Sequence, residues 1–243
     1  MQPLDWTPER VDEFWSEQTE HPENQFSYHS GAAVIRHFAP FLKGRQRVLD
    51  YGCGSGHFVP HLMKRVTSVT ATDIASGAIA ATNARNAGAK HFEGAFPVAE
   101  LVDRGEKFDA IVSVEVVEHL ADTALNDYLA SADKLLSRDG ILLISTPNNE
   151  NLSIWNVYCP HCKHNFHRWQ HVRSWTADSL AVALAPHGLI RLTSYGTNYG
   201  VGWKGKVVLS LIGKYERPNL IFIAKNEVIK SHVRENVGGT ENG

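Results

Sequence analysis

Apolar residues recur along this chain in two rhythms, and each rhythm predicts a different kind of element. Short unbroken apolar runs, such as "FDAIVSV" at 108–114 and "ILLISTP" at 141–147, are typical of strands buried on both faces of a sheet. Between such runs lie segments whose apolar residues repeat at helical spacing. Strands that alternate with helices predict a mostly parallel sheet covered on both faces, so we expect a doubly wound α/β fold.

The same pattern gives bounds for the expected elements. Strands are expected at 47–51, 68–74, 90–94, 108–114, 141–147, 189–196 and 218–226. Helices are expected at 8–18, 31–42, 57–66, 76–88, 123–140 and 176–188. Ser76 is placed to cap the helix that starts there and Gly88 to end it.

Some segments depart from this alternation and indicate how the chain is organised. We expect residues 1–45 to form an N-terminal helical cap over a ligand cleft, residues 46–230 to form the main domain, and residues 231–243 to be a flexible polar tail. Two long inserts, 149–175 and 197–216, interrupt the main domain. Long irregular stretches are usually functional loops, and these leave near the sheet edge where ligands bind in such folds. We expect the first insert to be lid-like.

Composition then restricts the classes of function. The chain of 243 residues has a formal net charge of -2 and a pI near 6.7, so it has no general attraction to nucleic acid or membranes. Its start lacks the apolar region of a signal peptide, and no apolar run approaches the roughly 18 residues of a membrane span. Three cysteines argue against a disulfide framework. We expect a cytoplasmic protein with a small-molecule substrate; the oligomeric state stays open.

The stretch "VLDYGCGSGHF", residues 48–58, places three glycines directly after an expected strand. Gly52, Gly54 and Gly56 would let the main chain approach a ligand at the start of the following helix. The pattern is G-x-G-x-G, because His57 stands where the dinucleotide-binding pattern G-x-G-x-x-G has its third glycine. A dinucleotide is therefore poorly supported as the ligand.

Two carboxylates flank the glycine loop. Asp50 lies at the strand end before the loop, where it would repel a pyrophosphate and attract a cation. Asp73 ends the next strand, where a carboxylate can accept hydrogen bonds from both hydroxyls of a ribose. A cationic amino acid joined to a ribose describes S-adenosylmethionine, which is the expected cofactor.

These residues resemble the motifs of the class I S-adenosylmethionine-dependent methyltransferases over about residues 47–188 and the final strand. "VLDYGCGSG" is similar to the family's first motif, "ATDIA" to its ribose-binding acid and "FDAIVSVEVVEHL" to its fourth strand. The resemblance implies a seven-stranded Rossmann-like methyltransferase sheet. It also places adenine near 93–97, where Ala95 replaces an acid of many relatives, so that contact would come from the backbone. The implied cofactor-binding residues are Asp50, Gly52, Cys53, Gly54, Gly56, Asp73, Ile74, Gly94, Ala95 and Glu115, with Cys53 as a small packing residue.

The segment "EVVEHL" directly follows the strand at 108–114. Glu115, Glu118 and His119 stand at i, i+3 and i+4, so a helical turn would point all three the same way. Two carboxylates and an imidazole on one face form either a divalent-metal site, for Mg²⁺ or Mn²⁺, or an acid/base cluster. In the superfamily that these residues resemble, the motif often holds no metal, and its histidine shapes the acceptor pocket.

The first insert adds a cluster of cysteines and histidines. Cys159, Cys162, His167 and His171 have spacings that would supply two thiolates and two imidazoles to a tetrahedral Zn²⁺. "CPHC" resembles a zinc knuckle, although a second knuckle is missing. The alternatives are a reduced structural cysteine pair or a histidine-rich lid over the pocket.

His171 has a second candidate role. In small-RNA 3′-terminal 2′-O-methyltransferases, which the E-x-x-E-H motif and a later histidine resemble, such residues hold a divalent ion, here implying Glu115, Glu118, His119 and His171. The insert looks more like those of small-molecule O-methyltransferases of quinone and glycan biosynthesis. We therefore expect methylation of a small molecule, a quinone, glycan or lipid-linked sugar, at oxygen, with His119 or His171 as base. An RNA 2′-O-methyltransferase and a catalytically silent zinc-binding protein of the same fold are the alternatives.

Overall fold

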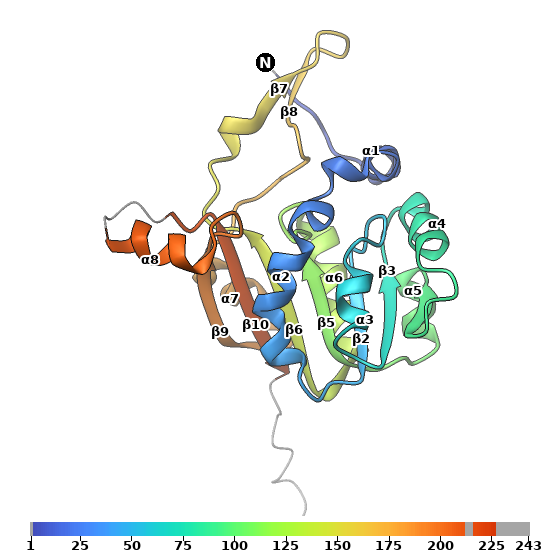
Figure 1. Cartoon of the computed structure of the whole chain (residues 1–243). Helices are drawn as coiled ribbons and strands as arrows, with labels where there is room; N and C mark the ends of the chain where they lie inside the picture. The colour runs from blue at the N-terminus through green and yellow to red at the C-terminus, as the bar shows by residue number, and fades with distance from the viewer. Residues whose placement is uncertain (1, 212–215, 227–243) are drawn as a thin grey trace, which may run out of the picture.

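The computed structural model describes residues 2–211 and 216–226, so the tail expected at 231–243 lies outside the described residues. Its centre is a seven-stranded sheet with the order β4-β3-β2-β5-β6-β10-β9 (Figure 1). Neighbouring strands from β4 to β6 run parallel, and β10 is antiparallel to both β6 and β9. The expected doubly wound α/β fold is confirmed.

The sheet strands are β2 Arg47–Tyr51, β3 Ser68–Thr72, β4 Phe92–Ala95, β5 Phe108–Val114, β6 Leu136–Pro147, β9 Leu189–Thr197 and β10 Asn219–Asn226. The helices are α1 Pro8–Thr19, α2 Phe26–Leu42, α3 Val59–Met63, α4 Ser76–Arg85, α5 Val98–Asp103, α6 Asp122–Leu135, α7 Ala177–Leu184 and α8 Trp203–Leu211. None of these helices in the described part of the chain combines the length and apolar character that crossing a membrane would require.

Alternate residues of the central strands build two separate cores, one on each face of the sheet. Val48 belongs to the core that includes Phe38 of α2 and Leu62 of α3. The next residue, Leu49, belongs to the opposite core, which includes Leu129 of α6 and Leu180 of α7. The continuous apolar runs of the sequence are explained by this burial from both sides.

Several expected bounds are wrong in detail. The helix expected at 123–140 ends at Leu135, because Leu136 already pairs with β5, and residues 137–140 form an irregular start of β6. The helix expected at 57–66 is the short α3, and Ala75 rather than Ser76 is the N-cap residue of α4. The second insert, expected to be irregular, contains α8.

The first insert forms part of a second, small sheet. β7 Asn156–Tyr158 and β8 His164–His167 make an antiparallel hairpin, and β1 Gln2–Pro3 pairs in parallel with β8. This hairpin projects away from the main sheet, with the amino terminus beside it (Figure 1). The N-terminal segment and the first insert are therefore joined through main-chain pairing.

Candidate active site

The glycine loop follows β2 at the carboxyl edge of the sheet, as expected. Gly52, Gly54 and Gly56 have φ values of 84°, 52° and 74°, in the left-handed region that side chains disfavour. A Cβ on Gly52 would lie 2.4 Å from Cγ2 of Val116, and one on Gly56 would lie 2.9 Å from Oγ1 of Thr82. The glycines are thus required by the turn itself and by close packing against neighbouring segments.

The amide groups of the loop are all occupied by partners within the protein. They donate from Gly52 and Cys53 to Thr72 O, from Gly54 to Asp73 Oδ2, from Ser55 to Gln25 Oε1 and from Gly56 to Cys53 O, over 2.8 to 3.1 Å. A phosphate-binding loop needs free amide donors. This loop is therefore unsuited to a pyrophosphate, which agrees with the missing third glycine.

Replacing Gly52 with alanine should destabilise the protein more than replacing Gly44, a matched control. Gly44 has nearly the same φ, 82°, but nothing lies within 4 Å of a Cβ placed on it. Left-handed strain alone should cost Gly44→Ala about 1–2 kcal/mol. Gly52→Ala should lose about 1–3 kcal/mol more from the overlap with Val116, measured by urea unfolding.

Two further results would decide this prediction. Shortening Val116 to alanine in the Gly52→Ala background should recover part of the loss, which a double-mutant cycle measures. Equal unfolding free energies for Gly52→Ala and Gly44→Ala would contradict the packing role.

Asp50 and Asp73 lie on either side of the loop. Asp50 is 1% exposed, and its Oδ2 has no hydrogen-bond partner among the described residues. Burial, and then the nearby Asp73, raise the pKa of Asp50 to about 7. Burial also raises the pKa of Asp73, although the amides of Ala75 and Gly54 oppose this by donating to it. A bound cation would compensate this accumulation of buried negative charge.

Three other residues expected to line the cofactor site differ in how accessible they are to a ligand. Ile74, beside Asp73, is 64% exposed, so its side chain is open to a ligand. The Cys53 side chain is buried in the core, and burial raises its pKa well above the usual range, so it packs as expected. The amide and carbonyl of Ala95 are both bonded to the side chain of Asn83, at 2.8 and 2.9 Å. The backbone contact expected between Ala95 and adenine is therefore disfavoured.

The E-x-x-E-H segment does not form the expected helical turn. Glu115 has a left-handed φ of 52°, and the residues after it form an irregular turn. The carboxylates nevertheless lie on the same edge of the sheet. Glu115 accepts a bond of 2.8 Å from Ser145, and Glu118 accepts one of 2.9 Å from Thr146.

Glu118, His119 and His171 offer ligand atoms that all lie within 4.8 Å of one another. The Oε1 atom of Glu118 and the Nδ1 atom of His119 are buried without a hydrogen-bond partner among the described residues. Because unpaired buried polar atoms are costly, this cluster has the character of a binding site for a proton donor or a cation. His171, from the first insert, lies beside the motif after β5.

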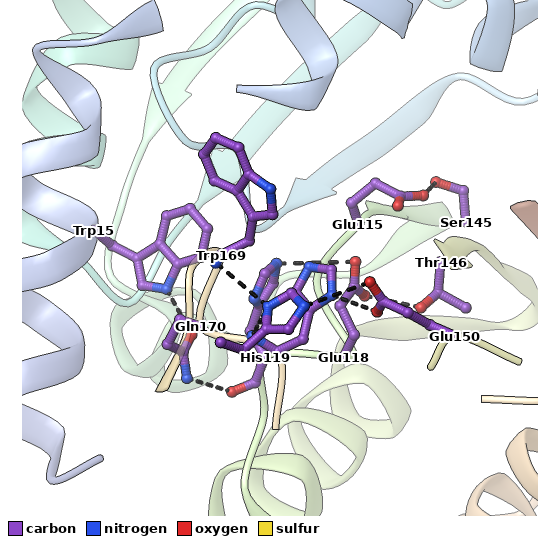
Figure 2. A network of polar contacts seen from close by, with 11 residues as sticks. Trp15, Glu115, Glu118, His119, Ser145, Thr146, Glu150, Trp169 and Gln170 are labelled. Atoms are coloured by element: carbon purple, nitrogen blue, oxygen red, sulfur yellow. Dashed lines mark hydrogen bonds and ion pairs between the residues drawn. The ribbon is translucent and has the colours of Figure 1, made fainter. Parts of the chain in front are cut away.

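Glu150 is a site residue that the sequence analysis missed. Its Oε2 atom lies 2.5 Å from His171 Nδ1, and its Oε1 atom lies 3.5 Å from His167 Nε2 (Figure 2). His167 Nδ1 accepts bonds from the amides of Trp169 and His171, so Nε2 must carry the proton of the neutral ring. That leaves His167 poorly suited to bind a metal, and its buried Nε2 faces Glu150 without a hydrogen bond to any described residue.

Backbone strain is concentrated around this cluster. Four non-glycine residues of the described chain have positive φ, and three of them are Glu115, Asn149 and Gln170. Asn149 immediately precedes Glu150, and Gln170 immediately precedes His171. Such conformations cost free energy and tend to occur at functional sites. The chain therefore turns sharply at or directly before Glu115, Glu150 and His171.

Trp15, Gln170 and Tyr199 complete the surroundings of the cluster, and the sequence analysis singled out none of them. Trp15 of α1 donates to Gln170 Oε1, and Gln170 donates to the carbonyl of His119, at 2.9 and 3.0 Å (Figure 2). The Trp15 ring also packs edge-on against His119. Tyr199 is in the second insert; burial, and then the Glu115 carboxylate, raise its pKa.

Burial sets the protonation of the cluster. It raises the pKa of Glu115 to about 7 and that of Glu118 well above its usual range, with Glu115 raising the latter further. Burial, and then His171, hold the pKa of His119 well below its usual range. At neutral pH the His119 ring is therefore uncharged, the form that can accept a proton or bind a metal.

The four residues expected to bind zinc do not form one site. Cys159 and Cys162 lie at the end of the β7–β8 hairpin, whereas His167 and His171 lie beside Glu150. Neither cysteine belongs to any group of three or more metal-binding side chains among the described residues. The reason is that β8 is extended: three residues of strand carry the chain about 10 Å from His164 to His167.

The sheet order and the glycine loop at its carboxyl edge define a Rossmann-like methyltransferase fold. Solved structures agree: an N1-methyltransferase of Burkholderia thailandensis that acts on 1,6-didemethyltoxoflavin superposes with a TM-score of 0.63 at 19% identity, covering 92% of this chain and 93% of that one. The N-methyltransferase NodS of Bradyrhizobium japonicum gives 0.56 at 16% identity, covering 87% and 98%. At these identities the likeness shows the fold alone.

Sequence comparison then gives the family. Residues 24–192 match the methyltransferase domain family, and the chain belongs to that family. The ubiquinone biosynthesis O-methyltransferase of Azorhizobium caulinodans is 35% identical over 123 residues, 47% of each chain. That of Bartonella bacilliformis is 34% identical over 104 residues, 42% of this chain and 41% of its own. The chain thus matches somewhat less than half the length of these curated relatives.

Proposed function

We propose that this protein transfers the methyl group of S-adenosylmethionine to a hydroxyl oxygen of a small molecule. The observation that carries this proposal is the pairing of two distinct sites at one sheet edge. One is a loop with occupied amides beside the buried Asp50 and the half-buried Asp73, and the other is a partly buried cluster of glutamates and histidines. The O-methyltransferases among the relatives support oxygen as the acceptor atom.

The first site fits the cofactor by its chemistry. The unpartnered Oδ2 of Asp50 and the raised pKa of this group suit the ammonium of the methionine part. Asp73 retains lone pairs for the ribose hydroxyls, since each of its oxygens accepts one amide bond. The exposed Ile74 side chain offers an apolar surface to the adenine ring. S-adenosylmethionine supplies an activated methyl group when bound.

The second site can remove the proton of the acceptor hydroxyl. Glu150 bonds His171 Nδ1, so that nitrogen carries the hydrogen and Nε2 is the atom left to accept a proton. His119 and Glu118 line the same position. Burial lowers the pKa of His119 and keeps its ring uncharged, and burial raises the pKa of Glu118 and favours its protonated form. Alignment of the hydroxyl with the methyl group can contribute about 7–11 kcal/mol to lowering the barrier. The residues therefore serve as base and as orienting walls.

A divalent ion, Mg²⁺ or Mn²⁺, is a second role that the cluster supports. Glu118, His119 and His171 offer one carboxyl group and two imidazoles within reach of one ion. The unpartnered Oε1 of Glu118 favours this role. When bound, such an ion would lower the pKa of the acceptor hydroxyl. An RNA acceptor is disfavoured by the net charge of -2. A catalytically silent zinc-binding protein of the same fold is disfavoured because the glutamate and histidine cluster is intact.

The test is a transfer assay with the purified protein before and after chelation of metal ions. The protein would be incubated with S-adenosylmethionine and a panel of phenols, catechols, sugars and matched amines, and products would be read by mass spectrometry. We expect O-methylated products, and methylation confined to the amines would contradict the proposal. Activity lost after chelation and restored by Mn²⁺ or Mg²⁺ would assign the cluster to a metal, whereas activity unchanged by chelation would assign it to His171 as base.

A further inference from the structure

The end of the β7–β8 hairpin carries two cysteines that the proposed methyl transfer does not use. Cys159 and Cys162 are free thiols, half-buried and exposed respectively. They lie in the connection between the two strands, where Cys159 N donates to His164 O and Lys163 N donates to Cys159 O. The hairpin projects from the body of the molecule (Figure 1), and among the described residues neither cysteine joins the metal-binding group around Glu150.

The connection is already folded as a tight turn that holds both cysteines. Lys163 N donates to Cys159 O at 2.8 Å, a bond that spans the C-x-x-C segment. Lys163 has a left-handed φ of 60°, which closes the turn immediately after the second cysteine. Two cysteines separated by two residues on such a turn are one half of the usual ligand set of a structural zinc site.

The other half is absent from the described part of this chain. Structural zinc is almost always four-coordinate and tetrahedral. Among the described residues no group of three or more metal-binding side chains includes Cys159 or Cys162, although His161 and His164 are close in sequence. Within the part of the chain that the structure describes, a complete site at this position therefore lacks two ligands, and the same hairpin of a second copy offers two thiols.

The same hairpin presents unusually large apolar side chains to solvent. Ile154 is 67% exposed and Trp155 46% exposed, and Val157 and Tyr158 lead directly to Cys159 and are also exposed. β7 is the outer strand of the small sheet, so one of its main-chain edges is open. Exposed apolar surface and an open strand edge are features of a contact surface between proteins.

We propose that two copies of this chain join through their β7–β8 hairpins and share one zinc ion. Cys159 and Cys162 of each copy supply the four thiolates, and the exposed side chains of residues 154–158 pack against their counterparts. A two-fold axis through the ion makes the contact self-complementary. The inference concerns a different part of the molecule from the proposed methyl transfer and does not depend on it.

The hairpin is held firmly enough to serve this purpose. β1 pairs with β8, and Leu4 N donates to Asn165 O at 2.9 Å. Trp6 packs edge-on against Phe166 at 5.9 Å between ring centroids, and also against Phe14 of α1. The hairpin is thereby attached to α1, whose Trp15 reaches the cluster around His119. A shared zinc ion would restrain the β7–β8 hairpin, and through it β1 and α1, in both copies.

The experiment measures mass and metal content together. Full-length protein, reduced and freed of metal, would be titrated with Zn²⁺ and followed by light scattering after size exclusion. We expect conversion from monomer to dimer, complete at about half a zinc ion per chain, because four thiolates occupy one ion. Co²⁺ in place of Zn²⁺ should give the absorption bands of tetrahedral thiolate coordination, and chelation should return the monomer.

Substitutions at the hairpin show whether the two thiols of each copy hold the shared ion. Cys159→Ser/Cys162→Ser should remain monomeric at the same zinc level, while keeping the circular dichroism spectrum and the urea unfolding midpoint of the wild type as signs of folding. His161→Ala, which leaves both thiols, should dimerise like the wild type. Wild-type protein that stays monomeric with zinc bound at one ion per chain would overturn the proposal. So would zinc-dependent dimerisation of the double serine variant, or a Cys159–Cys162 disulfide that persists in reducing buffer.

Discussion

Replacing Asp73 with alanine should weaken the binding of S-adenosylmethionine by about 100-fold or more. Hydrogen bonds to a charged group contribute about 1.5–3 kcal/mol each, and two ribose hydroxyls would lose theirs. The amides of Gly54 and Ala75 would also lose their acceptor, which loosens the glycine loop beside the ligand. Isothermal calorimetry with S-adenosylmethionine and with S-adenosylhomocysteine measures the effect.

Asp109→Ala is the matched control for this substitution. The Asp109 carboxylate also accepts two backbone amide bonds, from Gln46 and Arg47 at 2.8 and 3.0 Å, but it lies at the start of β5, on the opposite edge of the sheet. The Asp109→Ala substitution should lower the free energy of unfolding without changing the affinity for the cofactor. If Asp73→Ala bound both nucleosides as tightly as Asp109→Ala does, the proposed position of the cofactor would be wrong.

The features predicted correctly from the sequence are those encoded by neighbouring residues. The alternation of buried strands and helices gave the sheet, because burial on both faces requires continuous apolar runs. The glycine loop, Asp50 near the end of β2 and Asp73 directly after β3 were found because parallel strands present their carboxyl ends at one edge. Each of these features can be inferred within about ten residues of chain.

The features that were missed depend on contacts between distant segments. Glu150 meets His171 because Asn149 N donates to Trp175 O and Asn149 adopts a left-handed conformation. Neither fact has a local signal in the sequence. Tyr199 approaches Glu115 from the second insert in the same way. The proposed catalytic cluster is therefore assembled by tertiary structure, and only its E-x-x-E-H part is visible as a motif.

The two errors about the cluster have a common physical cause, an assumed local geometry. Spacing at i, i+3 and i+4 suggested a helix, but Glu115 N donates to Ser145 O and the chain turns sharply there. Likewise, the expected zinc site assumes that its four ligands lie on one compact loop, whereas the extended strand β8 carries His167 away from the cysteines. A spacing brings side chains together only for the backbone conformation that the spacing assumes.

His171→Ala should abolish most of the methyl transfer while leaving cofactor affinity nearly unchanged. Loss of a base positioned at the acceptor hydroxyl typically costs about 100- to 10,000-fold in rate. His171 lies beside Glu118 and His119 on the acceptor side, so S-adenosylmethionine should bind within about twofold of the wild-type affinity, a difference well below 1.4 kcal/mol. Single-turnover assays at saturating cofactor separate the chemical step from binding.

Two comparisons make this result specific to the Glu150–His171 pair. His91→Ala removes a histidine that bonds the carbonyl of Thr67 near the start of β4, away from the cluster, and should retain full activity. Glu150→Gln keeps an acceptor for His171 Nδ1 but removes the charge that stabilises the protonated ring, so it should lower kcat less than His171→Ala and leave KM for the cofactor unchanged. A His171→Ala variant that turns over at the wild-type rate would exclude His171 both as base and as metal ligand, and the proton would then have to leave through His119.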